Sequence, residues 1–183
     1  DGAKELPAEY QEAVYKLVLK NGGEKEFDQI LGLFDSLTLN TARKAALQGL
    51  GAAPTDALRT RALEFAIGGK VKLQDLFYVA ISMHTSGEAG LNATWAFFKE
   101  NLPKYTELYD KASASLMDAV ISGACRSFAT AEKAAEVKAF FAAQALPKNE
   151  RTIAQLTESI ETNAKYADAV RASKAKAWLE ARG

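Results

Sequence analysis

A chain of 183 residues and 19.7 kDa is within the usual size of one domain, and roughly 70% of the unfolded surface of such a chain is buried on folding. Its apolar fraction of 48% and charged fraction of 25% exclude a disordered or low-complexity protein. Because 23 basic and 23 acidic residues cancel, the broad positive field that nucleic acid or an anionic membrane requires is missing, and we expect neither partner.

The cysteine content and the lengths of the apolar runs indicate the cellular compartment and exclude some kinds of segment. Cys125 is the single cysteine, so no disulfide can form within the chain, and this fits a reducing compartment. No apolar run approaches the length of a membrane span, and the opening residues DGAKELPAEY contain no signal-peptide core. The numbering starts at Asp1 rather than at methionine, which we interpret as an excised domain or a processed product.

In the first half of the chain, apolar residues recur at the spacing of one face of an α-helix. The clearest stripe follows the i, i+3, i+4, i+7 pattern of an amphipathic helix without an error and comprises Phe27, Ile30, Leu31, Phe34 and Leu37. A helix at 7–20 is expected to carry Tyr10, Val14 and Leu17 on one face and to close with a left-handed ending at 21–23.

Three more helices are expected at about 40–50, 58–67 and 73–85. Asn40 and Thr55 are the expected N-caps of the first two. Gly49 and Gly51 each cost about 1 kcal/mol relative to alanine inside a helix. That cost indicates close approach of a neighbouring helix.

The second half continues with a helix that carries Leu91, Trp95, Phe98 and Leu102, and we expect Pro103 to stop it or to begin the next, short element at 105–109. Ser115–Ala145 predicts a helical hairpin. Its first helix is rich in small residues, and its second is capped by Thr130 and buries Ala134, Val137 and Phe141. Further helices are predicted at about 153–164 and 173–181.

The fold class follows from this succession. No segment alternates apolar and polar residues in the way of a strand, so we predict an all-α protein, an antiparallel helical array of about ten helices with short connections. Stretches 47–66 and 120–140 resemble each other weakly, which favours a HEAT/armadillo-like α-solenoid. Residues 1–183 are expected to form a single helical domain.

Signatures of catalysis are missing. His84 is the only histidine and lies far from Cys125 in the sequence, so the ligand spacings of a zinc site cannot occur, and no metal site is expected in this chain. Ser82 precedes His84 by two residues, but no G-x-S-x-G elbow surrounds it. Gly-rich phosphate loops and paired carboxylates are also missing, so we predict no catalytic residue here.

Two arginines are more informative than the other polar residues. Arg126 stands among Ala124, Cys125 and Phe128, so it is either a solvated or ion-paired residue at a helix edge or is aimed into a groove, where it can bind a carboxylate in bidentate fashion. Arg151 stands at a helix start, where the helix dipole disfavours a cation. It indicates either a partner carboxylate or pairing with Glu150.

An ordered set of strings gives the chain a family resemblance: VYKLVLKNGG at 14–23, LGAAPTDALRTRALEFA at 50–66, KVKLQDLFYV at 70–79, WAFFKEN at 95–101, AEVKAFF at 135–141 and ERTIAQLTESIETNAKYADAV at 150–170. In this order and spacing they resemble the C-terminal helical domain of zinc aminopeptidases of the puromycin-sensitive type. The likeness covers essentially the whole chain. The HExxH and GxMEN motifs of that family's catalytic domain do not occur here.

The resemblance implies a non-catalytic domain that caps the active-site cavity of a parent aminopeptidase and governs peptide access and length selection. It implies zinc in the parent enzyme, none in this chain, and two partners, the catalytic domain of the same polypeptide and peptide substrates. Arg126, Arg151 and Lys165 are our candidates for cations that face the substrate cavity. A cytoplasmic location is expected from the sparse cysteine and from the subfamily.

Two alternatives stay open. A stand-alone helical-repeat scaffold that binds a protein or peptide would share the same fold, and fold does not settle function. A small stand-alone hydrolase would need an active site that the sequence does not show. We expect this chain alone to be inactive.

Overall fold

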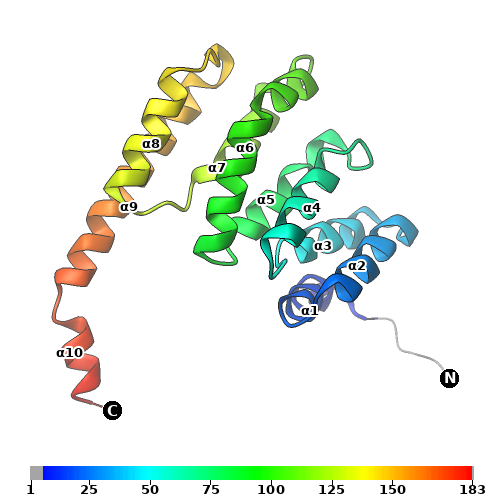
Figure 1. The fold of residues 1–183 in the computed structure, drawn as a ribbon, viewed down its shortest axis with the longest axis horizontal. Helices are drawn as coiled ribbons and strands as arrows, with labels where there is room; N and C mark the ends of the chain where they lie inside the picture. The colour runs from blue at the N-terminus through cyan, green and yellow to red at the C-terminus, as the bar shows by residue number, and fades with distance from the viewer. Residues whose placement is uncertain (1–5, 183) are drawn as a thin grey trace. The chain divides into compact units, whose positions relative to one another are not determined.

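The structure, a computed structural model, describes residues 6–182 and is all-helical over them, with no strand. The helices are α1 (Ala8–Lys20), α2 (Glu24–Ser36), α3 (Asn40–Leu50), α4 (Asp56–Ala66), α5 (Phe77–His84), α6 (Glu88–Tyr109), α7 (Ala114–Cys125), α8 (Ala131–Ala142), α9 (Glu150–Ala172) and α10 (Ala175–Glu180). Short 3₁₀ turns, Leu73–Asp75 and Pro147–Asn149, precede α5 and α9. Figure 1 shows this succession, and it confirms the predicted fold class.

The chain divides into two compact units, residues 1–124 and 125–183. The boundary falls inside the stretch Ser115–Ala145, next to the end of α7. Both helices predicted for that stretch are present, as α7 and α8. Their packing as a hairpin and the single domain over residues 1–183 stay predictions.

In the first unit, α3 is the central helix and packs against α1, α2 and α5, while α6 packs against α4 and α5. Several of these contacts join helices two apart in the sequence, as happens when helix pairs are stacked on one another. The core includes the predicted stripe residues Phe27, Ile30 and Phe34 of α2. Phe34 meets the ring of Phe65 edge to face, with 5.3 Å between the centroids.

Small residues let these helices approach closely, as predicted. A Cβ atom at Gly49 would lie 2.6 Å from Cβ of Tyr15 in α1, and one at Gly51 would lie 2.5 Å from Cβ of Ser82 in α5. Neither distance is compatible with a side chain at the glycine. The two residues therefore allow α3 to pack against α1 and α5.

Two local expectations about helix ends are wrong. Asn40 does not cap α3, because its side-chain oxygen accepts a hydrogen bond from Nζ of Lys72 at 3.0 Å. The ending at 21–23 is not left-handed: the positive φ angles of the described residues occur only at Gly69 and Gly87. In α1, Tyr10, Val14 and Leu17 fall on one face as expected; Tyr10 and Leu17 are exposed, and Leu19 is the residue fully buried.

Pro103 does not interrupt the chain's longest aromatic stripe. α6 is one helix of 22 residues with Pro103 inside it. Trp95, Phe98, Tyr105 and Tyr109 are buried along it, and the rings of Phe98 and Tyr105 lie 5.7 Å apart across the proline. Pro103 itself is exposed, so water can solvate the carbonyl group that has lost its helical donor. We infer that the free energy gained by burying these aromatic side chains exceeds the cost of a proline inside the helix, so α6 continues through Pro103.

Candidate functional site

In the second unit, α8 packs against α9 as a helical hairpin. Oγ1 of Thr130 accepts a hydrogen bond from the backbone N–H of Lys133 at 3.2 Å, which confirms it as the N-cap of α8. The apolar stripe of α8 is buried as predicted, at Ala134, Val137 and Phe141. It packs on the buried positions of α9: Leu156, Ile160 and Ala164.

Two adjoining hollows of about 720 Å³ and 360 Å³ lie along this hairpin. Both are lined by Lys138 of α8 and Glu161 of α9, whose Nζ and Oε1 atoms form an ion pair at 3.8 Å. We call the pair of hollows the seam groove. Its apolar lining includes Phe141, Leu146 and Ile153, together with the alanines at 131, 134, 135, 142, 145, 154 and 164.

The charge of the seam groove is negative. Its lining contains four carboxylates, Glu150, Glu158, Glu161 and Asp168, against the two ammonium groups of Lys138 and Lys165, which gives a net charge of −2. Within residues 6–182, Glu150 and Glu158 form no ion pair. An apolar, alanine-lined groove with acidic edges is suited to a helix or peptide segment that carries apolar and basic side chains.

The three predicted cations lie at different places in the second unit, and all three are exposed. Arg151 is in the first turn of α9, and Lys165 is about 21 Å further along it at 1.5 Å per residue. Arg126 follows α7, close in sequence to Phe128, whose carbonyl accepts from Nδ2 of Asn163. Only Lys165 lines the seam groove. The structure thus does not gather the three into one cluster.

The residues weighed for catalysis have structural roles. Nδ1 of His84 lies 2.8 Å from the carbonyl oxygen of Gly123, which can only accept, so Nδ1 carries a proton. Oγ of Ser82 donates to the carbonyl oxygen of Gln48 at 2.5 Å, and Ser82 is 3% exposed. Burial raises the pKa of the Cys125 thiol to about 12, so the thiolate nucleophile does not form near neutral pH.

One partly buried ion pair was not predicted from the sequence. Oδ1 of the buried Asp75 lies 3.7 Å from Nζ of Lys44, and the pKa of Lys44 is raised, first by a hydrogen bond with Tyr78 and then by Asp75. The pair joins α3 to the start of α5 and is part of the packing of the first unit.

The acidic edge of the seam groove was also missed. Its signal was present in the sequence, because Glu150, Glu158 and Glu161 recur at spacings that bring them to one side of α9. The groove itself cannot be predicted from this spacing alone, because its lining combines residues of both α8 and α9.

The described residues contain neither a candidate metal-ligand group nor a helix suited to span a membrane. Within 6–182, no three side chains of His, Cys, Asp or Glu are grouped so that they could hold a metal ion. A zinc ion therefore does not fit the residues of this part of the chain. None of the helices described combines the length and apolar character that crossing a membrane requires.

The fold is an all-α helical array over the described residues, and comparison with known families gives its class. A family profile described as "ERAP1-like C-terminal domain" matches residues 1–162. The chain belongs to this family.

The similar curated proteins are aminopeptidases by name. They include Aminopeptidase M1-B of Oryza sativa subsp. japonica, 27% identical over 91% of this chain, and Aminopeptidase 2, mitochondrial, of Saccharomyces cerevisiae, 26% identical over 90%. Puromycin-sensitive aminopeptidase of Caenorhabditis elegans is 24% identical over 87%. The chain covers only 17–19% of the length of these relatives.

Proposed function

We propose that this chain is the non-catalytic C-terminal domain of a zinc aminopeptidase, where it caps the active-site cavity and governs which peptides enter. The observation that carries the proposal is the family match over residues 1–162. A further observation supports it: the relatives are aminopeptidases by name, and the chain covers less than a fifth of their length.

In this proposal the zinc and the catalytic residues belong to another part of the parent polypeptide. The catalytic domain of that polypeptide is then the first partner, and peptide substrates are the second. Stacked helix pairs, as in a HEAT-like array, would give the rigid wall that a cavity cap requires. A cytoplasmic location remains our prediction, and one relative is named as mitochondrial.

The cavity-facing role of the cations is tested in the full-length enzyme. Arg126→Glu, Arg151→Glu and Lys165→Glu reverse exposed charges that form no ion pair within residues 6–182. We expect each to raise KM for long peptides and to shift the length preference, with kcat for a single-residue chromogenic substrate unchanged. A peptide ladder of increasing length provides the measurement.

Lys104→Glu is the matched control, because it makes the same charge reversal at an exposed cation of α6 in the first unit, whereas the three candidates belong to the second. It is expected to leave the length preference as it is. If all three cation variants behave like Lys104→Glu, the cations have no part in peptide selection.

The absence of catalysis is tested on the chain itself. The purified 183-residue chain is expected to release no N-terminal amino acids from peptides, with or without added zinc. Activity that is abolished by a chelator and cannot be traced to a contaminant would overturn the proposal.

A stand-alone scaffold that binds a protein or peptide is the second candidate, and the seam groove is the observation that favours it. The coding sequence around the segment separates the two. An upstream HExxH and GxMEN would support the aminopeptidase domain, and a reading frame without them would support the scaffold.

A further inference from the structure

The second unit contains an apolar segment that stays more than half exposed, although the guanidinium of Arg182 lies 4.1 Å from the centre of the Trp178 ring. α9 continues past α8, and Ala164 is its last buried residue (Figure 1). α9 ends at Ala172, and residues 173–182 then form an arm that contains α10, which we call the α10 arm. Trp178 and Leu179 of this arm are 54% and 63% exposed.

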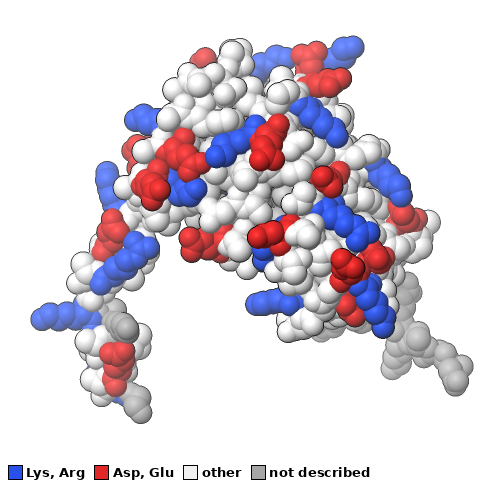
Figure 2. Space-filling view, in the orientation of Figure 1, with Lys and Arg blue, Asp and Glu red and all other residues white. Residues whose placement is uncertain are grey.

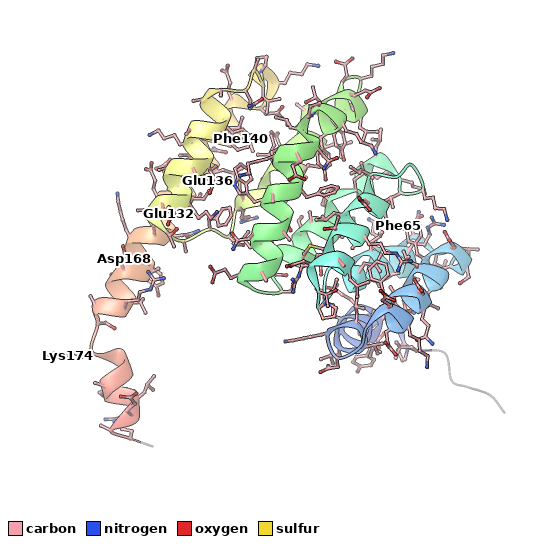
Figure 3. All side chains as sticks on the ribbon, in the orientation of Figure 1. Phe65, Glu132, Glu136, Phe140, Asp168 and Lys174 are labelled. Carbon is pink, nitrogen blue, oxygen red and sulfur yellow. The ribbon has the colours of Figure 1, made fainter. Side chains whose placement is uncertain are left out.

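The α10 arm and the seam groove are complementary in charge. The arm carries Lys174, Lys176 and Arg182 against Glu180, a net charge of +2. The groove carries a net charge of −2. Figure 3 shows Lys174 at the turn where the arm begins and Asp168 on the part of α9 beyond α8. Opposite charges of equal size steer the two surfaces together and fix their register.

They are also complementary in shape and polarity. The groove presents alanines and the apolar side chains of Phe141, Leu146 and Ile153. Small side chains let a further helix approach closely, and α10 is a helix that offers Trp178 and Leu179 as apolar anchors. Aromatic and large aliphatic residues that enter a pocket contribute most of the affinity of such contacts.

The arm cannot reach the main hollow of its own chain. Glu158 lies about 21 Å back along α9 from Ala172, at 1.5 Å per residue. Trp178 lies only about 8 Å of helix beyond Ser173 by the same rise. A straight α9 thus keeps the arm away from the hollow beside Glu158. An arm from another copy has no such restriction.

We propose that the chain associates with itself, with the α10 arm of one copy bound in the seam groove of another. Trp178 and Leu179 enter the larger hollow between α8 and α9, and Lys174 and Arg182 of the arm lie along Glu150 and Glu158. The contact is heterologous, since it joins two different surfaces. It does not depend on the aminopeptidase assignment.

Sedimentation equilibrium of the 183-residue chain up to high micromolar concentrations tests the proposal. The expected result is reversible association that weakens as salt is added, because salt screens exposed charges. The double variant Trp178→Ala/Leu179→Ala is expected to associate at least about tenfold more weakly. A chain that stays monomeric throughout the range would overturn the proposal.

The matched control removes a similar exposed apolar pair from α1. Tyr10 and Leu17 are 57% and 61% exposed, close to the values of Trp178 and Leu179. Tyr10→Ala/Leu17→Ala is expected to associate like the unmodified chain. Equal losses in both double variants would indicate a non-specific apolar contact and would also overturn the proposal.

Cross-linking locates the contact. On a Cys125→Ala background, Leu179→Cys is placed in one population and Ala154→Cys, in the groove lining, in a second. Mixing the two is expected to give a disulfide-linked dimer that each forms poorly alone. Leu17→Cys replaces Leu179→Cys in the control mixture. A yield no higher than that of the control would contradict arm-in-groove binding.

Discussion

Gly51 stands where α3 ends, at the point where the backbone of α5 approaches it closely. A Cβ atom there would lie 2.7 Å from the backbone nitrogen of Met83, which cannot move aside as a flexible side chain can. Gly51→Ala is therefore expected to lower the free energy of unfolding by about 1–3 kcal/mol, the cost of overpacking a core. Urea denaturation measures this change.

At Gly32, replacement by alanine is expected to have the opposite effect on stability. It lies inside α2 with no atom within 4 Å of an added Cβ. Gly32→Ala is expected to raise the free energy of unfolding by about 0.5–1 kcal/mol, because alanine is the better helix former. If Gly51→Ala also stabilised the chain, the close approach of α3 and α5 would be contradicted.

Cys125 makes stability depend on pH in the alkaline range. Burial raises the pKa of its thiol from 9.0 to about 12, so between these values the unfolded chain loses a proton that the folded chain keeps. The contribution is fully present below pH 9 and is lost as the pH rises. From pH 8 to pH 10 the loss from this residue is about 1.4 kcal/mol.

Cys125→Ala isolates that contribution. Buried Tyr105 and Tyr109, whose pKa values burial also raises, act mainly above pH 10 and are present in both proteins. Denaturation at pH 8 and pH 10 is expected to show a smaller decrease in the variant by about 1.4 kcal/mol. Equal decreases in the two proteins would mean that the thiol ionises in the folded state.

At the scale of single elements, α6 contains a proline whose replacement is expected to stabilise the helix. Pro103 lies inside the helix and leaves the carbonyl of Lys99 without its i+4 donor. Pro103→Ala restores that donor, and we expect the free energy of unfolding to rise by about 1–3 kcal/mol, reduced in part by the freer unfolded chain. Pro54→Ala, before the N-cap of α4, is the control and is expected to give no gain.

The helices and their ends were predictable from the sequence to different degrees. Periodicity located the helices of the described residues, and the side chains of Thr55 and Thr130 cap α4 and α8 as expected. Prediction failed at Asn40, whose side chain is taken by Lys72 from 32 residues away. It failed at Pro103 because packing of Tyr105 and Tyr109 overrides a local signal.

The candidate site was less predictable than the fold. A groove between two helices depends on which side chains flank their contact, and no local pattern gives that. Arg126 and Arg151 stood out in the sequence as charges in unusual places, yet neither lines the seam groove. Lys165 does line it, beside carboxylates that ordinary helical spacing concealed.

At the scale of the whole molecule, charges of both signs are mixed. On the face shown in Figure 2, basic and acidic side chains alternate without a large patch of one sign. The formal net charge at pH 7 is +0 and the sequence pI is about 6.8. Since repulsion between copies vanishes near the pI, solubility is expected to be lowest close to pH 6.8 and to rise at pH 5 and pH 9.

A precipitation series at constant protein concentration and low salt measures this dependence. Phosphate-free buffers avoid confusing salt effects with charge effects. A minimum that lies well away from pH 6.8 would show that specific contacts, rather than net charge, control solubility.

Because α9 extends past α8 (Figure 1), its backbone amides are expected to exchange hydrogen with solvent at two different rates. Up to Ala164 its backbone amides are protected by burial on α8, so their hydrogen exchange requires the hairpin to open. Residues 165–172 include no buried residue, although Lys165 and Asp168 line the smaller hollow beside α8, so they are protected mainly by the helix itself, which frays from its end. Exchange measured amide by amide is therefore expected to accelerate steadily from Lys165 to Ala172. Binding of this region by any partner would appear first as a slowing of that gradient.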